Sequence, residues 1–138
     1  MNIVVVHQSR SGNTKKAAEQ IGGHLVSDDN TVSVRSVSNL DLKELAVADL
    51  VFIGTWVDGL ILLGHRPGDV AKINQIPPLW NKPVVAFMTH ALNPGNAPIK
   101  LAKILESKGA EILLSQSINR KKLQNGTRAL VDEALLNF

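Results

Sequence analysis

The fold is decided by the stretch Ile3-Val4-Val5-Val6-His7-Gln8-Ser9-Arg10-Ser11-Gly12-Asn13-Thr14 near the start of the chain. Its first four residues are an unbroken apolar run, which is typical of a strand buried in a parallel sheet. A hydroxyl-rich turn follows, and an amphipathic helix is expected to begin near Thr14. Backbone N–H groups at the start of a helix lack partners and carry partial positive charge, so this turn is suited to bind an anion.

The turn also supplies the side-chain donors that a phosphate group needs. They are Ser9, Ser11, Asn13 and Thr14. Gly12 lets the backbone pass close to a phosphate, and Arg10 with nearby Lys15 adds positive charge that should strengthen binding of a dianion. With one glycine the pattern is neither a Walker A loop nor G-x-G-x-x-G, and it indicates a single terminal phosphate. The same residue types are ordinary caps and turn formers, so a purely structural role stays open at this point.

Composition indicates one globular domain spanning residues 1–138, with 44% hydrophobic and 20% charged residues. The chain has no cysteine, which excludes disulfides, thiol catalysis and Cys-ligated metals. The four histidines lack metal-binding spacing and there is no Gly-x-Ser-x-Gly elbow, so we predict no metal site and no catalytic residue. Without a membrane-length apolar run or a secretory signal, a cytoplasmic location is expected.

The charge balance is mildly basic, at +3 with an isoelectric point of about 9.4. Such a chain suits acidic proteins, acidic substrates or nucleic acid. The one tight cluster is Arg120-Lys121-Lys122, a kind of run that is usually a solvated loop. Aromatic residues make up 4% and tyrosine is absent, which disfavours nucleic acid.

Five strands alternating with helices are expected along the chain. The strands are residues 3–6, 31–37, 50–55, 83–88 and 111–118, and the helices are 14–25, 39–48, 70–76, 98–108 and a last one from 124 or 127 to 136. Asn39 or Asp41 would cap the second helix, and residues 56–69 are expected to form a long loop punctuated by glycine. This alternation predicts an α/β three-layer αβα sandwich whose five-stranded parallel sheet has the order 2-1-3-4-5.

In such sheets a ligand lies beyond the carboxyl ends of the strands, where the strand order reverses. That rule brings together the loops at residues 9–14, 55–59 and 89–96. The candidate binding residues are Ser9, Arg10, Ser11, Gly12, Asn13, Thr14, Thr55, Trp56, Val57, Asp58, Gly59, Thr89, His90, Leu92 and Asn93. An indole in the second loop would cover a large flat apolar ligand well.

Two of these loops resemble flavodoxins: Ser-x-Ser-Gly-Asn-Thr at residues 9–14, and Gly54-Thr55-Trp56-Val57-Asp58-Gly59. The resemblance implies flavin mononucleotide (FMN) as the cofactor, with Trp56 stacked on one face of its ring. It also implies that the peptide at Val57–Asp58, or at Asp58–Gly59, flips so that its carbonyl accepts the flavin N5–H after one-electron reduction. Asp58 would then disfavour a negatively charged reduced flavin.

The third loop departs from the flavodoxin pattern, because flavodoxins commonly cover the outer flavin face with a tyrosine. Here His90, Leu92 or Asn93 must cover that face, or it stays open to a quinone or another substrate. The apolar run at residues 60–63 is expected to fold over the flavin edge, continue a helix or form a self-association surface. His65 and Arg66 beside it would serve a structural role or meet a substrate or partner.

The first interpretation is therefore an FMN protein that carries single electrons between a reductase and an acceptor, with redox proteins, acidic ones among them, as partners. In this role the protein tunes the flavin and performs no bond chemistry of its own. An FMN-dependent quinone or small-molecule reductase is the enzymatic alternative. A third is a flavodoxin-like fold that has lost FMN and serves as an interaction module.

Overall fold

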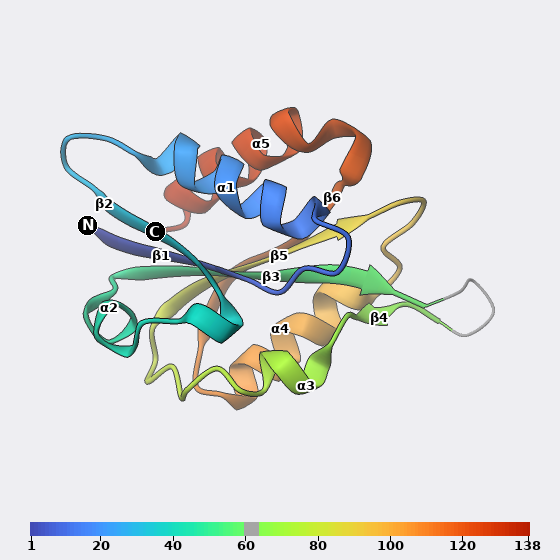
Figure 1. Cartoon of the computed structure of the whole chain (residues 1–138), viewed down its shortest axis with the longest axis horizontal. Helices are drawn as coiled ribbons and strands as arrows, with labels where there is room; N and C mark the ends of the chain where they lie inside the picture. The colour runs from blue at the N-terminus through green and yellow to red at the C-terminus, as the bar shows by residue number, and fades with distance from the viewer. Residues whose placement is uncertain (60–63) are drawn as a thin grey trace.

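The computed structural model describes residues 1–59 and 64–138, and its centre is a twisted parallel sheet (Figure 1). The strands lie in the order β2 (Thr31–Ser36), β1 (Asn2–His7), β3 (Leu50–Asp58), β5 (Pro83–His90) and β6 (Glu111–Asn119). All neighbours in this order are parallel. The predicted three-layer fold and strand order are confirmed, with β5 and β6 as the fourth and fifth strands of the prediction.

Helices cover both faces of the sheet. α1 (Asn13–Leu25) and α5 (Leu123–Leu136) pack on one face, and α2 (Leu42–Val47), α3 (Val70–Ile73) and α4 (Ala97–Ser107) on the other. Two short 3-10 helices, η1 (Val37–Asn39) and η2 (Arg120–Lys122), follow β2 and β6. None of the helices in the described ranges is long and apolar enough to cross a membrane.

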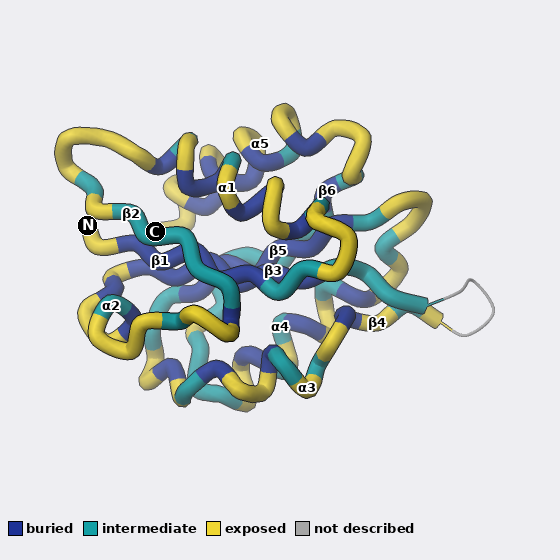
Figure 2. The backbone as a smooth tube through the Cα atoms, viewed as in Figure 1, coloured by how far each residue is buried: buried dark blue, intermediate teal, exposed yellow. Residues whose placement is uncertain are grey.

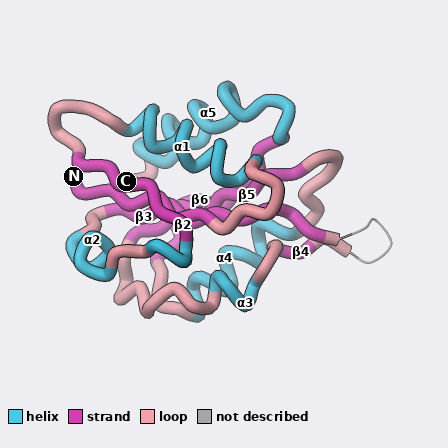
Figure 3. The backbone as a smooth tube through the Cα atoms, viewed as in Figure 1, coloured by secondary structure: helices cyan, strands magenta, loops and turns pink. Residues whose placement is uncertain are grey.

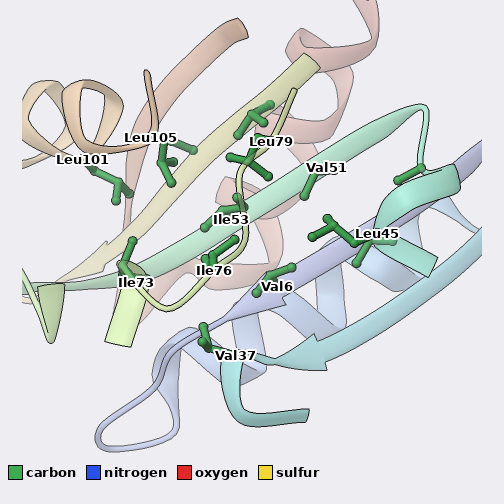
Figure 4. Close-up of a cluster of buried hydrophobic side chains, with 14 of the residues drawn as sticks. Val6, Val37, Leu45, Val51, Ile53, Ile73, Ile76, Leu79, Leu101 and Leu105 are labelled. Atoms are coloured by element: carbon green, nitrogen blue, oxygen red, sulfur yellow. The ribbon is translucent and has the colours of Figure 1, made fainter. Parts of the chain in front are cut away.

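The core consists of two apolar layers separated by the sheet (Figure 2). The layer under α2, α3 and α4 is shown in Figure 4, where Val51 and Ile53 of β3 lie in the same buried cluster as Leu101 and Leu105 of α4. β1 and β3 are central strands, so their side chains are buried on both faces, which explains their unbroken apolar runs. β2 is half-buried at the edge of the sheet, as its alternating pattern predicted.

Local capping chemistry sets the helix boundaries. Asp41 caps α2, accepting hydrogen bonds from the backbone N–H groups of Lys43 at 2.9 Å and Glu44 at 3.2 Å. The single helix predicted over residues 39–48 is therefore wrong in its first turn, because Asn39 ends η1 instead. α4 carries proline in its first turn, as predicted. α3 ends at Ile73 rather than at residue 76.

The prediction of a loop over residues 56–69 is wrong for residues 56–58 and 66–67, which are strands. β3 continues through Trp56 and Val57 to Asp58 and pairs antiparallel with β4 (Arg66–Pro67), as Figure 3 shows. The ladder continues one step further, where the Gly68 N–H donates to the Trp56 carbonyl oxygen at 2.8 Å. We call this β3–β4 extension the wall hairpin. The expectations for residues 60–63 fall outside the described ranges.

Candidate functional site

A cleft of about 280 Å³ opens at the carboxyl ends of β1, β3, β5 and β6. It is lined by Arg10, Ser11, Asn13, Thr14, Trp56, Val57, Thr89, His90, Ala91 and Arg120. Its size is near the lower end of the range for ligand clefts, roughly 300–1,000 Å³. The three loops that the sequence placed at this edge therefore meet around one cavity.

The first wall is the turn that leads into α1. Gly12 has a φ of +99°, which a glycine adopts without strain. The first helical hydrogen bond runs from Lys16 N–H to Gly12 O at 2.9 Å, so the N–H groups of Asn13, Thr14 and Lys15 have no partner within the helix. The N-cap residue is Gly12, which has no side chain to cap these groups, and the first turn of α1 holds no acidic residue. This helix end is thus left open for an anionic group.

The turn is tied to the far side of the cleft. The hydroxyl of Thr14 makes a 2.9 Å hydrogen bond with the hydroxyl of Thr89 at the end of β5, and both residues are buried. β1 and β5 are not neighbours, because β3 lies between them. Ser9 closes the turn by accepting a bond from the Gly12 N–H at 3.1 Å. These bonds fix the position of the turn relative to the opposite wall of the cleft.

Trp56 forms the second wall and is held in place by the wall hairpin. A Cβ atom added at Gly68 would lie 2.1 Å from Cε2 of Trp56, so the indole lies directly across that glycine. Thr55 is fully buried and donates from its hydroxyl to the Gly68 carbonyl oxygen at 2.7 Å. The Trp56 indole N–H is buried and has no hydrogen-bond partner among the described residues. Thr55 therefore supports this wall without lining the cleft.

Of the rest of the predicted second loop, Val57 lines the cleft, whereas Asp58 and Gly59 do not. Asp58 accepts a bond from the Gly59 N–H at 2.9 Å and forms an ion pair of 3.6 Å with Arg66 across the hairpin. Its charge is therefore partly offset by a cation that sequence reasoning did not pair with it. Gly59 has a φ of +112°, and a Cβ there would meet the Gly64 carbonyl oxygen at 2.1 Å. The peptide at Val57–Asp58 belongs to a strand ladder and not to the predicted turn.

The third wall follows β5. His90 lines the cleft and its Nδ1 lies 2.6 Å from the Ser117 hydroxyl of β6. Burial lowers the pKa of His90 below its ordinary value, which favours the neutral imidazole. Leu92 is 84% exposed, and Asn93 accepts a bond from the Gly95 N–H at 2.9 Å. Neither of these two residues lines the cleft, and among the described residues no phenylalanine, tyrosine or tryptophan lines this side.

His65 and Arg66 have structural partners. The His65 ring packs against Gly95, where an added Cβ would lie 2.5 Å from Nδ1. The Lys100 ammonium group donates to the His65 carbonyl oxygen at 2.7 Å. The wall hairpin is therefore attached to the start of α4.

Two lining residues, Ala91 and Arg120, were missed from the sequence. β6 pairs with β5 so that Asn119 lies beside His90, which places Arg120 at the edge of the cleft. The same rule of carboxyl ends, applied to the last strand, would have found it.

A second, polar cleft of about 380 Å³ lies on the β2 side of the same turn. It is lined by His7, Gln8, Ser9, Lys15, Val34, Arg35, Ser36 and Asn39. Burial and, to a lesser extent, the Lys15 charge lower the pKa of His7. Arg35 is held there by Glu44, whose carboxylate accepts from Nη2 at 2.8 Å. Ser9 thus faces this second cleft and not the first.

The donors of the first cleft fit FMN. Its α1 end offers unpartnered backbone N–H groups, two hydroxyls, an amide and the Arg10 guanidinium, which is the chemistry that holds a phosphate monoester. The Trp56 indole offers a flat apolar surface on the adjacent wall, close enough for one ligand to meet both.

The fold and this cleft define a doubly wound α/β protein with an anion-binding turn at its topological switch point. More particularly, the chain belongs to the flavodoxin domain family, whose model matches residues 4–123. That family comprises FMN-binding electron-transfer proteins.

Solved structures agree with this assignment. A flavodoxin from the domain Archaea is 27% identical with a TM-score of 0.69, and the alignment covers 99% of both chains. Two-electron reduced Megasphaera elsdenii flavodoxin is 19% identical with a TM-score of 0.77, covering 96% of this chain and 97% of that one. Oxidised flavodoxin 2 from Bacillus cereus is 20% identical with a TM-score of 0.71 over the full length of both. Among curated proteins, none matches the chain significantly.

Proposed function

We propose that this chain binds FMN in the first cleft and carries single electrons between a reductase and an acceptor in the cytoplasm. The observation that carries the proposal is the meeting of an open helix end with a fixed indole in one cleft. Bound FMN would supply one- and two-electron redox chemistry. The partners would be redox proteins, and the basic charge of the chain favours acidic ones.

Different residues of the cleft would bind different parts of the cofactor. The N–H groups of α1 would bind the phosphate together with Ser11, Thr14 and Arg10. Trp56 would cover one side of the ring and exclude water from it. His90, kept neutral by burial, would add a polar contact without adding a positive charge. None of these groups needs to move a proton to hold the cofactor.

Titration with FMN, followed by flavin fluorescence, tests the binding step. We expect tight binding of FMN and much weaker binding of riboflavin, which lacks the phosphate. Ser11→Ala should weaken FMN binding, because it removes one hydroxyl donor, while leaving riboflavin binding unchanged. Equal affinity for FMN and riboflavin would contradict the phosphate site. If neither flavin binds, both flavin functions fail and the interpretation of the chain as an interaction module remains.

Stepwise anaerobic reduction of the FMN-loaded protein then tests the electron-carrying role. A visible spectrum that passes through a separate one-electron state would support the carrier. A direct two-electron change would contradict it.

One observation favours a second candidate function, an FMN-dependent quinone or small-molecule reductase. The β5 side of the cleft is lined by Thr89, His90 and Ala91, and among the described residues no phenylalanine, tyrosine or tryptophan closes it. A planar substrate would fit there. Oxidation of a nicotinamide nucleotide by the FMN-loaded protein without an added reductase would distinguish this enzyme from the carrier.

A further inference from the structure

The mouth of the first cleft carries a dense group of cations. Arg10 and Arg120 line the cleft, and Lys121 and Lys122 complete η2 directly after Arg120. All four residues are exposed. We call these four residues the basic rim.

The basic rim is fixed to the sheet at both ends of η2. Asn119, the last residue of β6, accepts a bond from the Lys121 N–H at 2.9 Å. Leu123 follows η2 and is only 6% exposed, so it holds the start of α5 in the core. The run Arg120-Lys121-Lys122, which the sequence indicated as an ordinary solvated loop, is therefore an ordered turn at the cleft.

The charges of the basic rim are not neutralised within the described ranges. The ion pairs found there are Arg35–Glu44 and Arg66–Asp58, and no residue of the basic rim takes part in either. No described residue that lines the cleft is acidic. An unneutralised cationic surface attracts an oppositely charged one and raises its rate of encounter.

An apolar group lies at the same edge. Leu92 is 84% exposed and follows Ala91, which lines the cleft together with Arg120. Interfaces between proteins commonly combine an apolar centre with a polar rim. Leu92 and the basic rim offer this combination beside the cofactor cleft.

Three aspartates lie at the opposite end of the sheet. Asp28 and Asp29 lie between α1 and β2, and Asp49 directly precedes β3 (Figure 1). Asp49 accepts a bond from the Asn2 N–H at 2.7 Å at the amino end of β1. These carboxylates therefore lie away from the basic rim and do not neutralise it.

We propose that the basic rim docks the acidic surface of a one-electron redox protein over the mouth of the cleft. This inference rests on the proposed function, because the docked partner would exchange electrons with the cofactor in that cleft. Partner carboxylates would meet the basic rim, and a partner apolar side chain would meet Leu92. One electron leaves the partner's metal centre and enters the cofactor, and no covalent bond forms or breaks.

The test measures how fast an acidic plant-type [2Fe–2S] ferredoxin reduces the FMN-loaded protein by stopped flow. Its potential, about −400 mV, makes it a strong reductant. For the unaltered protein, the second-order rate constant should fall at least about tenfold as ionic strength rises from about 0.01 to 0.3 M, because screening shortens the reach of exposed charges.

Two variants of equal net charge separate docking from overall charge. K121Q/K122Q removes two cations of the basic rim that do not line the cleft, and K43Q/K103Q removes two exposed cations from α2 and α4. At low ionic strength we expect K121Q/K122Q to lower the rate about fivefold or more and to flatten its salt dependence. K43Q/K103Q should stay within about twofold of the unaltered protein. Equal effects of the two variants, or a rate that rises with salt, would overturn the proposal.

Separate measurements distinguish failure of docking from failure of the proposed function. The FMN titration reports the cofactor alone, and calorimetry reports ferredoxin binding to the chain without FMN. If FMN does not bind, the proposed function fails, but calorimetry still measures whether ferredoxin binds to the chain. Ferredoxin binding that K121Q/K122Q leaves unchanged would overturn the docking surface. The proposal would also be overturned if the chain bound anionic lipid vesicles while its rate of reduction by ferredoxin did not depend on salt.

Discussion

The contact between Trp56 and Gly68 sets the position of one cleft wall, and Gly68→Ala tests it. The added Cβ would lie 2.1 Å from Cε2 and 2.5 Å from Nε1 of the indole. Ordinary contacts between carbon atoms are roughly 3.5–4.0 Å. The backbone at residue 68 has little freedom to retreat, because both its N–H and its carbonyl group are hydrogen-bonded to β3. The indole must therefore move.

Two effects of different size should follow. Forcing a methyl group into a filled contact typically costs about 1–3 kcal/mol, so we expect the free energy of unfolding to fall by that amount. A displaced indole would also lose its stacking on the flavin, worth about 0.5–1.5 kcal/mol for an aromatic pair. That loss corresponds to FMN binding weakened by about twofold to tenfold.

Urea unfolding and FMN titration measure the two effects, and a Trp80→Phe background leaves Trp56 as the remaining fluorescent indole. Gly23→Ala is the matched control, since residue 23 is exposed in α1 and an added Cβ meets nothing within 4 Å. The control should stabilise the fold by up to about 1 kcal/mol. If Gly68→Ala has an unaltered unfolding free energy and unaltered Trp56 fluorescence, the indole does not lie across residue 68.

Three further predictions follow from the cleft. Thr14→Val should destabilise the fold by about 1–3 kcal/mol in urea unfolding, because it leaves the buried Thr89 hydroxyl without its partner, whereas Thr14→Ser should be nearly neutral. Arg120→Gln should make the flavin midpoint potential more negative by up to about 59 mV in spectroelectrochemistry, since one cation is removed from the cleft wall; an unchanged potential would count against this role. Burial lowers the folded-state pKa values of His7, of His90 and of His24 in the last turn of α1, so the unfolded chain binds more protons. The free energy of unfolding should then fall as pH drops below about 6.5, and His7→Gln should make that fall shallower in urea titrations at several pH values.

The sheet was predictable because its central strands are buried on both faces. Residues 3–6, 50–53 and 83–88 are apolar without interruption, and each lies in a strand of the confirmed order. The wall hairpin was not predictable in this way. β4 has two residues, one of them proline, which is too short for any periodic pattern. Its pairing depends on the packing of Trp56 against Gly68, a contact between residues twelve positions apart that local pattern does not encode.

The candidate site was likewise predictable only in part. The carboxyl-end rule led to the turn at residues 9–14, Trp56 and His90, and the structure brings these around one cleft. Their contacts with FMN stay predictions. Leu92 and Asn93 were candidates because their loop follows β5, but neither lines the cleft: Leu92 is 84% exposed at its edge, and Asn93 accepts a bond from the Gly95 N–H. Arg120 was missed because its run of three cations was interpreted as a solvated loop, although the carboxyl-end rule, applied to the last strand, places it at the cleft.

The hydrogen bond between Thr14 and Thr89 has a consequence for the order of folding. It joins residues 75 positions apart, and the cleft also needs Arg120 from the far end of the sheet. Forming such distant contacts costs loop-closure entropy, which delays them relative to local structure. The β1–α1–β2 unit alone would hold the open helix end but not the facing walls. A cofactor that needs all of them binds only the finished sheet, and by mass action it would stabilise that state over every partly folded one.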